Sequence, residues 1–232
     1  DVGMSEADML LLSLHTDHVA GLPKQGGNPG PYTSKGVYLG IKAAIKRIFH
    51  TDSASGVRIA IQGVGSVGSG VARRLAAEGA DLVIADVDRS RAHNLAEEIN
   101  CKVESPDQIL NVEADVVSPN ALGAILTEEV VDKLKAKIVA GGANNQLSTG
   151  QEGQLMYERG ILYAPDYVIN AGRIISVLRH IDGAGDEEVN KRVDLISNRL
   201  VSIWDESQIR GQAPDVIADH MAQKLIGDQK TL

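Results

Sequence analysis

A glycine-rich turn between a short apolar run and an amphipathic stretch carries the clearest chemical signal in the sequence. Gly63, Gly65 and Gly68 form the pattern GxGxxG directly after residues 57–62. In this context the first glycine permits a tight turn, the second lets the backbone approach a ligand, and the third lets the next helix pack on the strand. The N-terminus of that helix offers N–H donors to a pyrophosphate. The residues expected to line this contact are Gly63, Gly65, Ser66, Val67 and Gly68.

An acidic residue ends the next apolar run, in the register that a dinucleotide site requires. Asp86 follows residues 81–85, where its carboxylate is placed to accept the ribose hydroxyls of an adenosine. The same carboxylate would repel a 2′-phosphate, so NAD is favoured over NADP, although Arg89 and Arg91 soften that repulsion. The alternative is that Asp86 only terminates a strand. Together the turn and the acid indicate a dinucleotide-binding domain and no particular reaction.

Short β-branched runs alternate with amphipathic stretches from residue 57 onward, which is typical of parallel βαβ units. Strands are predicted at residues 57–62, 81–85, 101–104, 115–118, 137–141 and 161–164. Helices are predicted at residues 66–78, 88–99, 127–135, 151–159, 167–180, 186–206 and 214–226. Short right-handed connections between them give an α/β fold, a Rossmann-type doubly wound parallel sheet with flanking helices.

Before the first strand the sequence predicts two helices and a loop. Ser5 is placed to cap a helix that runs toward His15, and its leucine-rich sequence predicts that it faces the core. Residues 21–32 are rich in Gly and Pro, which predicts a loop. Thr33 is placed to cap a second helix that ends near Phe49.

The composition argues against several classes of partner. The 232 residues carry a net charge of −8, which repels phosphate backbones and anionic lipid, so neither a nucleic acid nor a membrane is expected as a partner. Cys101 is the only cysteine, and the 6 histidines fit no spacing typical of zinc, so no metal site is expected. A lone thiol fits the reducing cytoplasm.

Three further segments carry a resemblance to a known family. They read GNPGPYTSKG at 27–36, GGANNQL at 141–147 and YAPDYVINAG at 163–172. With the glycine turn, in this order and at this spacing, they resemble the cofactor-binding half of the glutamate/leucine/phenylalanine/valine dehydrogenases, above all the leucine dehydrogenases. The resemblance implies reversible oxidative deamination of an L-amino acid to a 2-oxo acid and ammonia, with hydride passing to NAD.

The resemblance also implies roles for two residues near the start of the chain. Asp1 resembles the family's catalytic carboxylate, which moves protons to and from the substrate nitrogen. The alternative is a plain terminal acid. Thr33 resembles the threonine that hydrogen-bonds the nicotinamide carboxamide, and this role is compatible with capping a helix.

Two asparagines follow the predicted strand at 137–141, at the edge where open α/β folds bind ligands. Asn144 and Asn145 are expected to hold the nicotinamide ribose, and Asn145 also lies on the substrate side by resemblance. The alternative is that they are loop amides that bond their own backbone. By resemblance, Asn120 and Ala121 run along the cofactor's ribose.

The substrate side of the site is predicted around the last quoted segment. By resemblance, Asn170 lines the cleft, and Asp166 has a weaker claim because it is also placed to cap a helix. Ile174 and Val177 share a helix face, since residues i and i+3 are neighbours. In glutamate-specific members the second of these positions is polar, so two aliphatic groups favour leucine, isoleucine or valine, with phenylalanine or tryptophan behind. The alternative is that both residues belong only to the core.

The chain departs from the family pattern in two places. Arg173 stands where the family usually has a glycine, which leaves open its effect on substrate size and cofactor preference. The family's two catalytic lysines lie in an N-terminal domain, in a stretch ending in Gly-Gly-Lys that this sequence does not contain. Residues 1–50 are therefore interpreted as a helical connection from an N-terminal substrate and oligomerisation domain. Residues 51–166 are predicted to form the NAD-binding domain, and residues 167–232 to form helices that pack on the cleft and the sheet. The resemblance also implies a homo-oligomer.

Two other classes compete with this interpretation. A short-chain dehydrogenase needs Tyr-x-x-x-Lys after the glycine turn to polarise a hydroxyl, but Tyr38 and Lys42, which have that spacing, precede the turn. A NAD-sensing module needs cofactor binding alone. Asp1, Asn145 and the apolar pair argue against it, because a sensor requires no substrate side.

Overall fold

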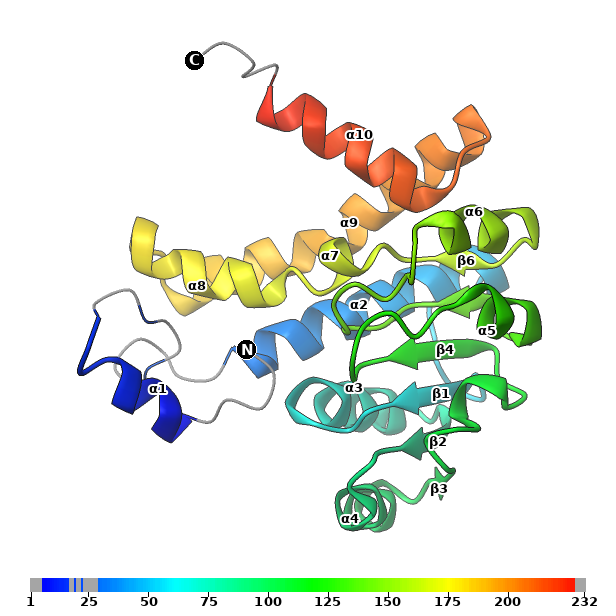
Figure 1. The fold of residues 1–232 in the computed structure, drawn as a ribbon, viewed down its shortest axis with the longest axis horizontal. Helices are drawn as coiled ribbons and strands as arrows, with labels where there is room; N and C mark the ends of the chain where they lie inside the picture. Colours follow the sequence, from blue (N-terminus) through cyan, green and yellow to red (C-terminus); the bar gives the residue numbers. More distant parts are fainter. Residues whose placement is uncertain (1–5, 17–18, 20–21, 23–28, 228–232) are drawn as a thin grey trace.

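The computed structural model of the protein describes residues 6–16, 19, 22 and 29–227. In these residues six parallel strands form one sheet in the order β3-β2-β1-β4-β5-β6 (Figure 1). The strands are β1 (Arg58–Gln62), β2 (Asp81–Ala85), β3 (Lys102–Val103), β4 (Val116–Pro119), β5 (Ile138–Val139) and β6 (Leu162–Tyr163). The chain winds outward from β1 to β3 and then in the other direction from β4 to β6. This order confirms the predicted Rossmann-type sheet.

Helices connect the strands and cover both faces of the sheet (Figure 1). They are α1 (Glu6–Leu12), α2 (Gly30–Phe49), α3 (Ser66–Ala77), α4 (Arg89–Ile99), α5 (Glu128–Lys133), α6 (Gln151–Glu158), α7 (Asp166–Ile169), α8 (Gly172–Asp182), α9 (Asp186–Arg210) and α10 (Pro214–Ile226), with a 3₁₀ turn at Ile109–Asn111. The first strand shows why a sheet between two helical layers needs so many aliphatic residues. Ile59 and Ile61 pack in one apolar cluster with α2, α3 and α9, whereas Ala60 packs in a second cluster with α5 and α6.

The second helix begins earlier than predicted. Thr33 does not cap α2, because the helix starts at Gly30 with Pro29 as its N-cap and Pro31 in its first turn. Proline suits the first turn of a helix, since its missing N–H has no partner to lose there. The hydroxyl of Thr33 donates instead to the carbonyl of Pro29 at 3.3 Å, and its side chain is buried.

The helix predicted at 167–180 is split into α7 and α8. Asn170 is the C-cap of α7, and α8 starts at Gly172. A Cβ on Gly172 would collide with the carbonyl of Tyr32 and lie 2.9 Å from Cα of Thr33, so this glycine lets α8 begin directly against the first turn of α2. The break therefore serves a close helix contact that periodicity alone does not reveal.

The first helix was predicted to face the core, and this prediction is wrong. Leu11 of α1 is 63% exposed and Leu14, just after it, is 76% exposed. An apolar run predicts that something covers a helix, but it does not identify the covering segment.

The division of the chain into parts stays a prediction. Helix α2 comes from the first predicted part and α9 from the third, yet both share an apolar cluster with the sheet. Among the described residues, no helix combines the length and apolar character needed to cross a bilayer.

Candidate functional site

The glycine turn joins β1 to α3 at the carboxyl edge of the sheet. Gly63 has a φ of +81°, the left-handed region that favours glycine, and its N–H donates to the carbonyl of Ala85 on β2 at 2.7 Å. Gly65 is the N-cap of α3, and no side-chain hydrogen bond caps this end of the helix. Because the N–H groups of the first turn and the positive end of the helix dipole meet here, the turn suits an anion.

Gly68 and Gly65 are glycines for different reasons. A Cβ on Gly68 would fall on the carbonyl oxygen of Gly63, so the fold itself requires glycine there. A Cβ on Gly65 would meet no described atom within 4 Å. The space above Gly65 is open, which fits the passage of a pyrophosphate close to the backbone.

Ala121 and Val67 complete the surroundings of the turn. A Cβ on Gly63 would lie 2.9 Å from Cβ of Ala121, so the loop after β4 presses against the turn. Val67, in the first turn of α3, lies beside Gly142 of the loop after β5, since a Cβ on Gly142 would lie 3.0 Å from Cγ1 of Val67. The structure thus brings three predicted cofactor-binding segments together at one edge, with Ser66 exposed at the start of α3.

Asp86 ends β2 beside the glycine turn, and its side chain is only 5% exposed. Its carboxylate accepts hydrogen bonds from the N–H of Val64 at 2.8 Å and from the N–H of Asp88 at 2.9 Å. Arg91 Nη1 lies 3.2 Å from Oδ1 of Asp86. Asp86 therefore fixes the backbone of the turn as well as ending a strand, and its contact with a ribose stays a prediction.

Asn120 ties the loop after β4 to the loop after β5. Its Nδ2 donates to the carbonyl oxygen of Ser118 at 2.9 Å and to the Ser118 hydroxyl at 3.0 Å. Its Oδ1 accepts from the N–H of Gly142 at 2.9 Å. The side chain thus holds the two loops in register, and any contact of Asn120 with a cofactor comes in addition to this internal role.

Asn170 and Asn144 meet at the same edge. The amide Nδ2 of Asn170 donates to Oδ1 of Asn144 at 2.6 Å, although the two residues follow different strands. Asn144 is exposed and Asn170 is half-buried. Since Oδ1 of Asn144 accepts this bond, the orientation of the Asn144 amide is set by a residue on the substrate side of the predicted site.

Asn145 adopts a left-handed backbone conformation, with a φ of +51°. Asparagine tolerates this region better than most residues, and the bend turns the chain so that the carbonyl of Asn145 accepts from the N–H of Ala124 at 2.6 Å. Its side chain is exposed. The geometry leaves its predicted contact with cofactor or substrate open to test.

Gln146 supports this loop and was not singled out by the sequence. It is fully buried, and its Nε2 donates to the carbonyls of Gly141 at 2.7 Å and Ala143 at 3.0 Å. A glutamine within a quoted motif gives no sign that it points inward, since asparagine and glutamine are mostly exposed in folded proteins.

The predicted pocket pair lies on α8. Ile174 is 56% exposed and Val177 is half-buried, whereas Ile175 and Ser176 between them are buried. Ile174 is therefore not a core residue of the described chain. Arg173, at the unusual position, is also exposed at the start of this helix.

The sequence assigned roles to two aspartates, Asp1 and Asp166. Asp1 lies outside the described residues. Asp166 does not cap α7, because the N-cap is Pro165 and makes no side-chain hydrogen bond. One Asp166 carboxylate oxygen instead accepts from the backbone N–H of Gln146, with 3.4 Å between oxygen and nitrogen.

Among the described residues, no group of three or more His, Cys, Asp or Glu side chains is arranged to hold a metal ion.

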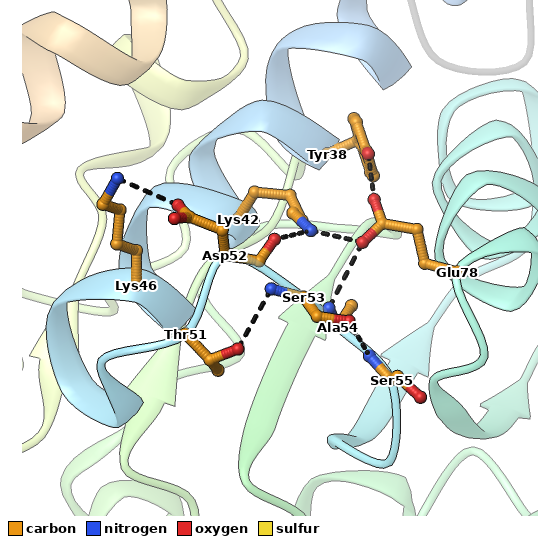
Figure 2. A network of polar contacts seen from close by, with 9 residues as sticks. All are labelled: Tyr38, Lys42, Lys46, Thr51, Asp52, Ser53, Ala54, Ser55 and Glu78. Atoms are coloured by element: carbon orange, nitrogen blue, oxygen red, sulfur yellow. Dashed lines mark hydrogen bonds and ion pairs between the residues drawn. The ribbon is translucent and has the colours of Figure 1, made fainter.

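Tyr38 and Lys42 belong to a different region. Figure 2 shows both side chains directed at Glu78, which follows α3, near the segment that leads into β1. The carboxylate of Glu78 also accepts from the N–H of Ala54 at 3.2 Å. Burial and the hydrogen bond to Glu78 raise the pKa of Tyr38 to about 12, which makes it a poor proton donor at neutral pH. This geometry argues against the short-chain dehydrogenase interpretation.

Comparisons with known proteins identify the family of the chain. A sequence profile described as Glutamate/Leucine/Phenylalanine/Valine dehydrogenase matches residues 84–202. The leucine dehydrogenase of Bacillus cereus is 42% identical over 233 residues, which is 99% of this chain and 64% of that protein. The L-tryptophan dehydrogenase of Nostoc punctiforme is 37% identical over 231 residues, 99% of this chain and 65% of that protein.

A solved structure extends the match to three dimensions. The crystal structure of the L-tryptophan dehydrogenase of Nostoc punctiforme has a TM-score of 0.86 and 34% identity, and the alignment covers 100% of this chain and 67% of that one. The chain spans only 64% of the length of the Bacillus cereus leucine dehydrogenase. The glycine turn, the quoted motifs, the profile match and the shared fold together show that the chain belongs to the glutamate/leucine/phenylalanine/valine dehydrogenase family.

Proposed function

We propose that the complete protein catalyses NAD-dependent oxidative deamination of an apolar L-amino acid, of the leucine, valine or isoleucine type, to a 2-oxo acid and ammonia. The carboxyl edge of the sheet carries this proposal. There, the open space above Gly65 lies at the same edge as the Asn144–Asn170 amide pair. An anion-binding turn together with uncharged hydrogen-bonding groups suits a dinucleotide whose ring must meet a substrate.

The roles proposed for the residues that would hold NAD rest on the family's motifs and on the loops that meet at this edge. The first turn of α3, at Gly65, Ser66 and Val67, would receive the pyrophosphate, and Asp86 the adenosine ribose. Asn144, Asn145 and the loop of Asn120 and Ala121 would hold the nicotinamide half, with Thr33 at its carboxamide. When bound, the nicotinamide supplies the acceptor for a hydride from the substrate.

Proton transfer at the substrate nitrogen is proposed for a residue of this chain. Asp1 is proposed to take protons from the substrate nitrogen and return them, and Asn170 to orient the substrate side of the cleft. The match covers 64% of the leucine dehydrogenase of Bacillus cereus, and the family's catalytic lysines have no counterpart in this sequence. The full catalytic set is therefore proposed for the complete polypeptide.

The substrate preference rests on α8. Ile174 and Val177 offer aliphatic surface, and each methylene that a substrate buries there contributes about 0.8 kcal/mol. A second candidate is an aromatic substrate, because the L-tryptophan dehydrogenase of Nostoc punctiforme and the phenylalanine dehydrogenase of Lysinibacillus sphaericus are 37% and 35% identical to this chain. The exposed position of Ile174 is compatible with either size of side chain.

The test is NADH formation by the full-length protein with leucine, isoleucine, valine, phenylalanine, tryptophan and glutamate in parallel. We expect turnover with branched-chain substrates, and we expect Asp1→Asn to abolish it while NADH binding persists. Preference for tryptophan or phenylalanine would select the second candidate. Tight NADH binding without turnover on any amino acid would contradict the enzymatic proposal and favour a cofactor-sensing module.

We further propose that the protein works as a cytoplasmic homo-oligomer. Leu11, Leu14 and Leu225 are 63%, 76% and 87% exposed, and such apolar surface is suited to subunit contact. Light scattering of the full-length protein tests the oligomer, and a monomeric mass would contradict it.

A further inference from the structure

An arginine stands at the adenosine end of the proposed dinucleotide site. Arg91 lies on α4, which follows β2, and its Nη1 is 3.2 Å from Oδ1 and 3.4 Å from Oδ2 of Asp86. Its Nη2 is 3.3 Å from Oδ2 of Asp88. Asp88 is also the N-cap of α4 and accepts the N–H of Arg91 at 3.1 Å. Arg91 is therefore held between two carboxylates at the end of β2.

The carboxylate of Asp86 has few acceptor positions left. Two carboxylate oxygens offer about four acceptor directions. The N–H of Val64 occupies one on Oδ2, and the N–H of Asp88 occupies one on Oδ1. Arg91 takes the remaining direction on each oxygen. These are the two directions that a pair of ribose hydroxyls would need, so Arg91 and a ribose diol compete for the same lone pairs.

Arg91 can leave this contact at low cost. Its side chain is 50% exposed, whereas the side chain of Asp86 is 5% exposed and keeps its two backbone hydrogen bonds. A displaced guanidinium remains tethered to α4, close to the 2′ position of a ribose bound at Asp86. There it matches a phosphate well, because its planar fork forms paired charge-assisted hydrogen bonds.

We propose that Arg91 sets the choice between the two dinucleotides: it competes with the ribose diol of NAD for Asp86, and it pairs with the 2′-phosphate of NADP. This inference rests on the proposed dinucleotide binding and deepens it. Asp86 alone would exclude a 2′-phosphate by like-charge repulsion. With Arg91 beside it, the exclusion is partial, and the chain binds NADP measurably.

Neighbouring residues supply matched variants. Arg89 is also exposed, carries the same charge and lies at the first position of α4, so Arg89→Gln controls for a loss of charge near the site. Asp88→Asn keeps an N-cap acceptor but removes one of the two carboxylates that hold Arg91. Arg91→Lys keeps the positive charge without the planar fork.

The experiment titrates the full-length protein with NADH and with NADPH and follows nicotinamide fluorescence, so it needs no turnover. Arg91→Gln should leave NADH binding equal or tighter and weaken NADPH binding about tenfold, the effect of one charge-assisted hydrogen bond. The NADPH affinity of Arg91→Lys should lie between those of the unaltered protein and Arg91→Gln. Asp88→Asn should tighten NADPH binding. Arg89→Gln should change the ratio of NADH affinity to NADPH affinity less than about twofold.

A probe without nicotinamide isolates the adenosine end. Adenosine 2′,5′-bisphosphate should compete with NADH, and Arg91→Gln should weaken its binding about tenfold. ADP, which carries the ribose diol and no 2′-phosphate, should bind the Arg91→Gln variant as tightly as the unaltered protein or more tightly. If Arg91→Gln changes the ratio of NADH affinity to NADPH affinity no more than Arg89→Gln does, the inference about Arg91 is overturned. Dinucleotide binding itself would still stand. Failure of the unaltered protein to bind NADH would instead overturn the proposed function.

Discussion

At the amino edge of the sheet, carboxylates bond charged side chains in contacts internal to the fold, whereas at the carboxyl edge, apart from the pairing of Arg91 with Asp86 and Asp88, backbone groups and uncharged amides predominate. Asp115, before β4, accepts from Arg58 of β1 through Nε at 3.2 Å, Nη2 at 3.0 Å and the backbone N–H at 3.0 Å. Glu78 gathers Tyr38 and Lys42 in the same way (Figure 2). The oxygens of these carboxylates accept hydrogen bonds from within the protein, and these contacts hold the ends of strands and helices in place.

At the carboxyl edge, the groups that suit an anion are not used by side chains of the fold. The first turn of α3 has no side-chain cap, and Gly65 has open space beside it. The amides of Asn120 and Asn170 hold loops and neighbouring side chains without adding charge. From this difference we expect the two edges of the sheet to have different roles. Substitutions at the amino edge should change stability, and substitutions at the carboxyl edge should change ligand binding.

The largest effect is expected inside the glycine turn, where the two roles lie three residues apart. Gly68→Ala would place a methyl on the carbonyl oxygen of Gly63, so we expect a loss of about 3 kcal/mol or more in the free energy of unfolding. Gly65→Ala meets no described atom within 4 Å and should leave stability nearly unchanged while weakening NADH binding. Urea unfolding and NADH titration of both variants check this. Equal losses of stability would break the distinction between the two glycines.

The next effect concerns the acidic group at the amino edge. Burial alone would raise the pKa of Glu78, but hydrogen bonds from Lys42, Tyr38 and the N–H of Ala54 outweigh it, and the pKa is lowered. A lowered carboxyl pKa in the folded state stabilises the protein above the ordinary value of 4.5, and this contribution is lost as the pH falls through the folded value. We therefore expect Glu78→Gln to cost about 1–2 kcal/mol at pH near 7 and progressively less in acid.

The fluorescence of Trp204 reports the unfolding, because it is the only tryptophan and is 1% exposed. Glu129→Gln is the matched control: Glu129 pairs with Lys133 on the surface of α5, and its hydrogen bond from Lys133 also lowers its pKa. Its removal should change stability far less, since exposed pairs contribute little. A pH-independent cost at Glu78 would show that its role is packing rather than charge.

Much of the fold was predictable because its signals are local. The glycine turn, the β-branched runs and the helical stretches between them each lie within about 20 residues, and parallel strands with short crossovers admit few topologies. The place of Asp86 followed from the same pattern, because strand order brings the ends of β1 and β2 side by side.

The side-chain partnerships were not predictable, because they join segments that periodicity does not relate. Nothing local shows that Asn170 bonds Asn144, or that Gln146 points inward. Thr33 was predicted to cap a helix that in fact starts at Gly30, since proline in the first turn was interpreted as loop. The leucines of α1 predicted a core-facing helix, but in the structure they are exposed, and the sequence does not indicate which surface they contact.

A smaller effect is expected at the amide pair of the carboxyl edge. Asn170→Ala removes the donor that orients Asn144, so we expect NADH binding to weaken about tenfold while the melting temperature falls by less than about 2 °C. Asn94→Ala, on the exposed face of α4, is the control and should change neither quantity. A fall in melting temperature with unchanged NADH affinity would move Asn170 from the binding edge to the structural one.

The smallest effect is expected at Asp115, and it sharpens the contrast between the two edges. The hydrogen bond from Arg58 is the main cause that lowers the pKa of Asp115, so its carboxylate is charged throughout the neutral range. Asp115→Asn keeps one acceptor oxygen for the backbone N–H of Arg58 but loses the negative charge and the second oxygen, which accepts from Nη2 of Arg58, so the melting temperature should fall by about 2–4 °C. Differential scanning calorimetry measures this shift. NADH binding should stay the same, because Asp115 and the glycine turn stand at opposite ends of neighbouring strands; a weakened NADH affinity would show that the two edges are energetically coupled through the sheet.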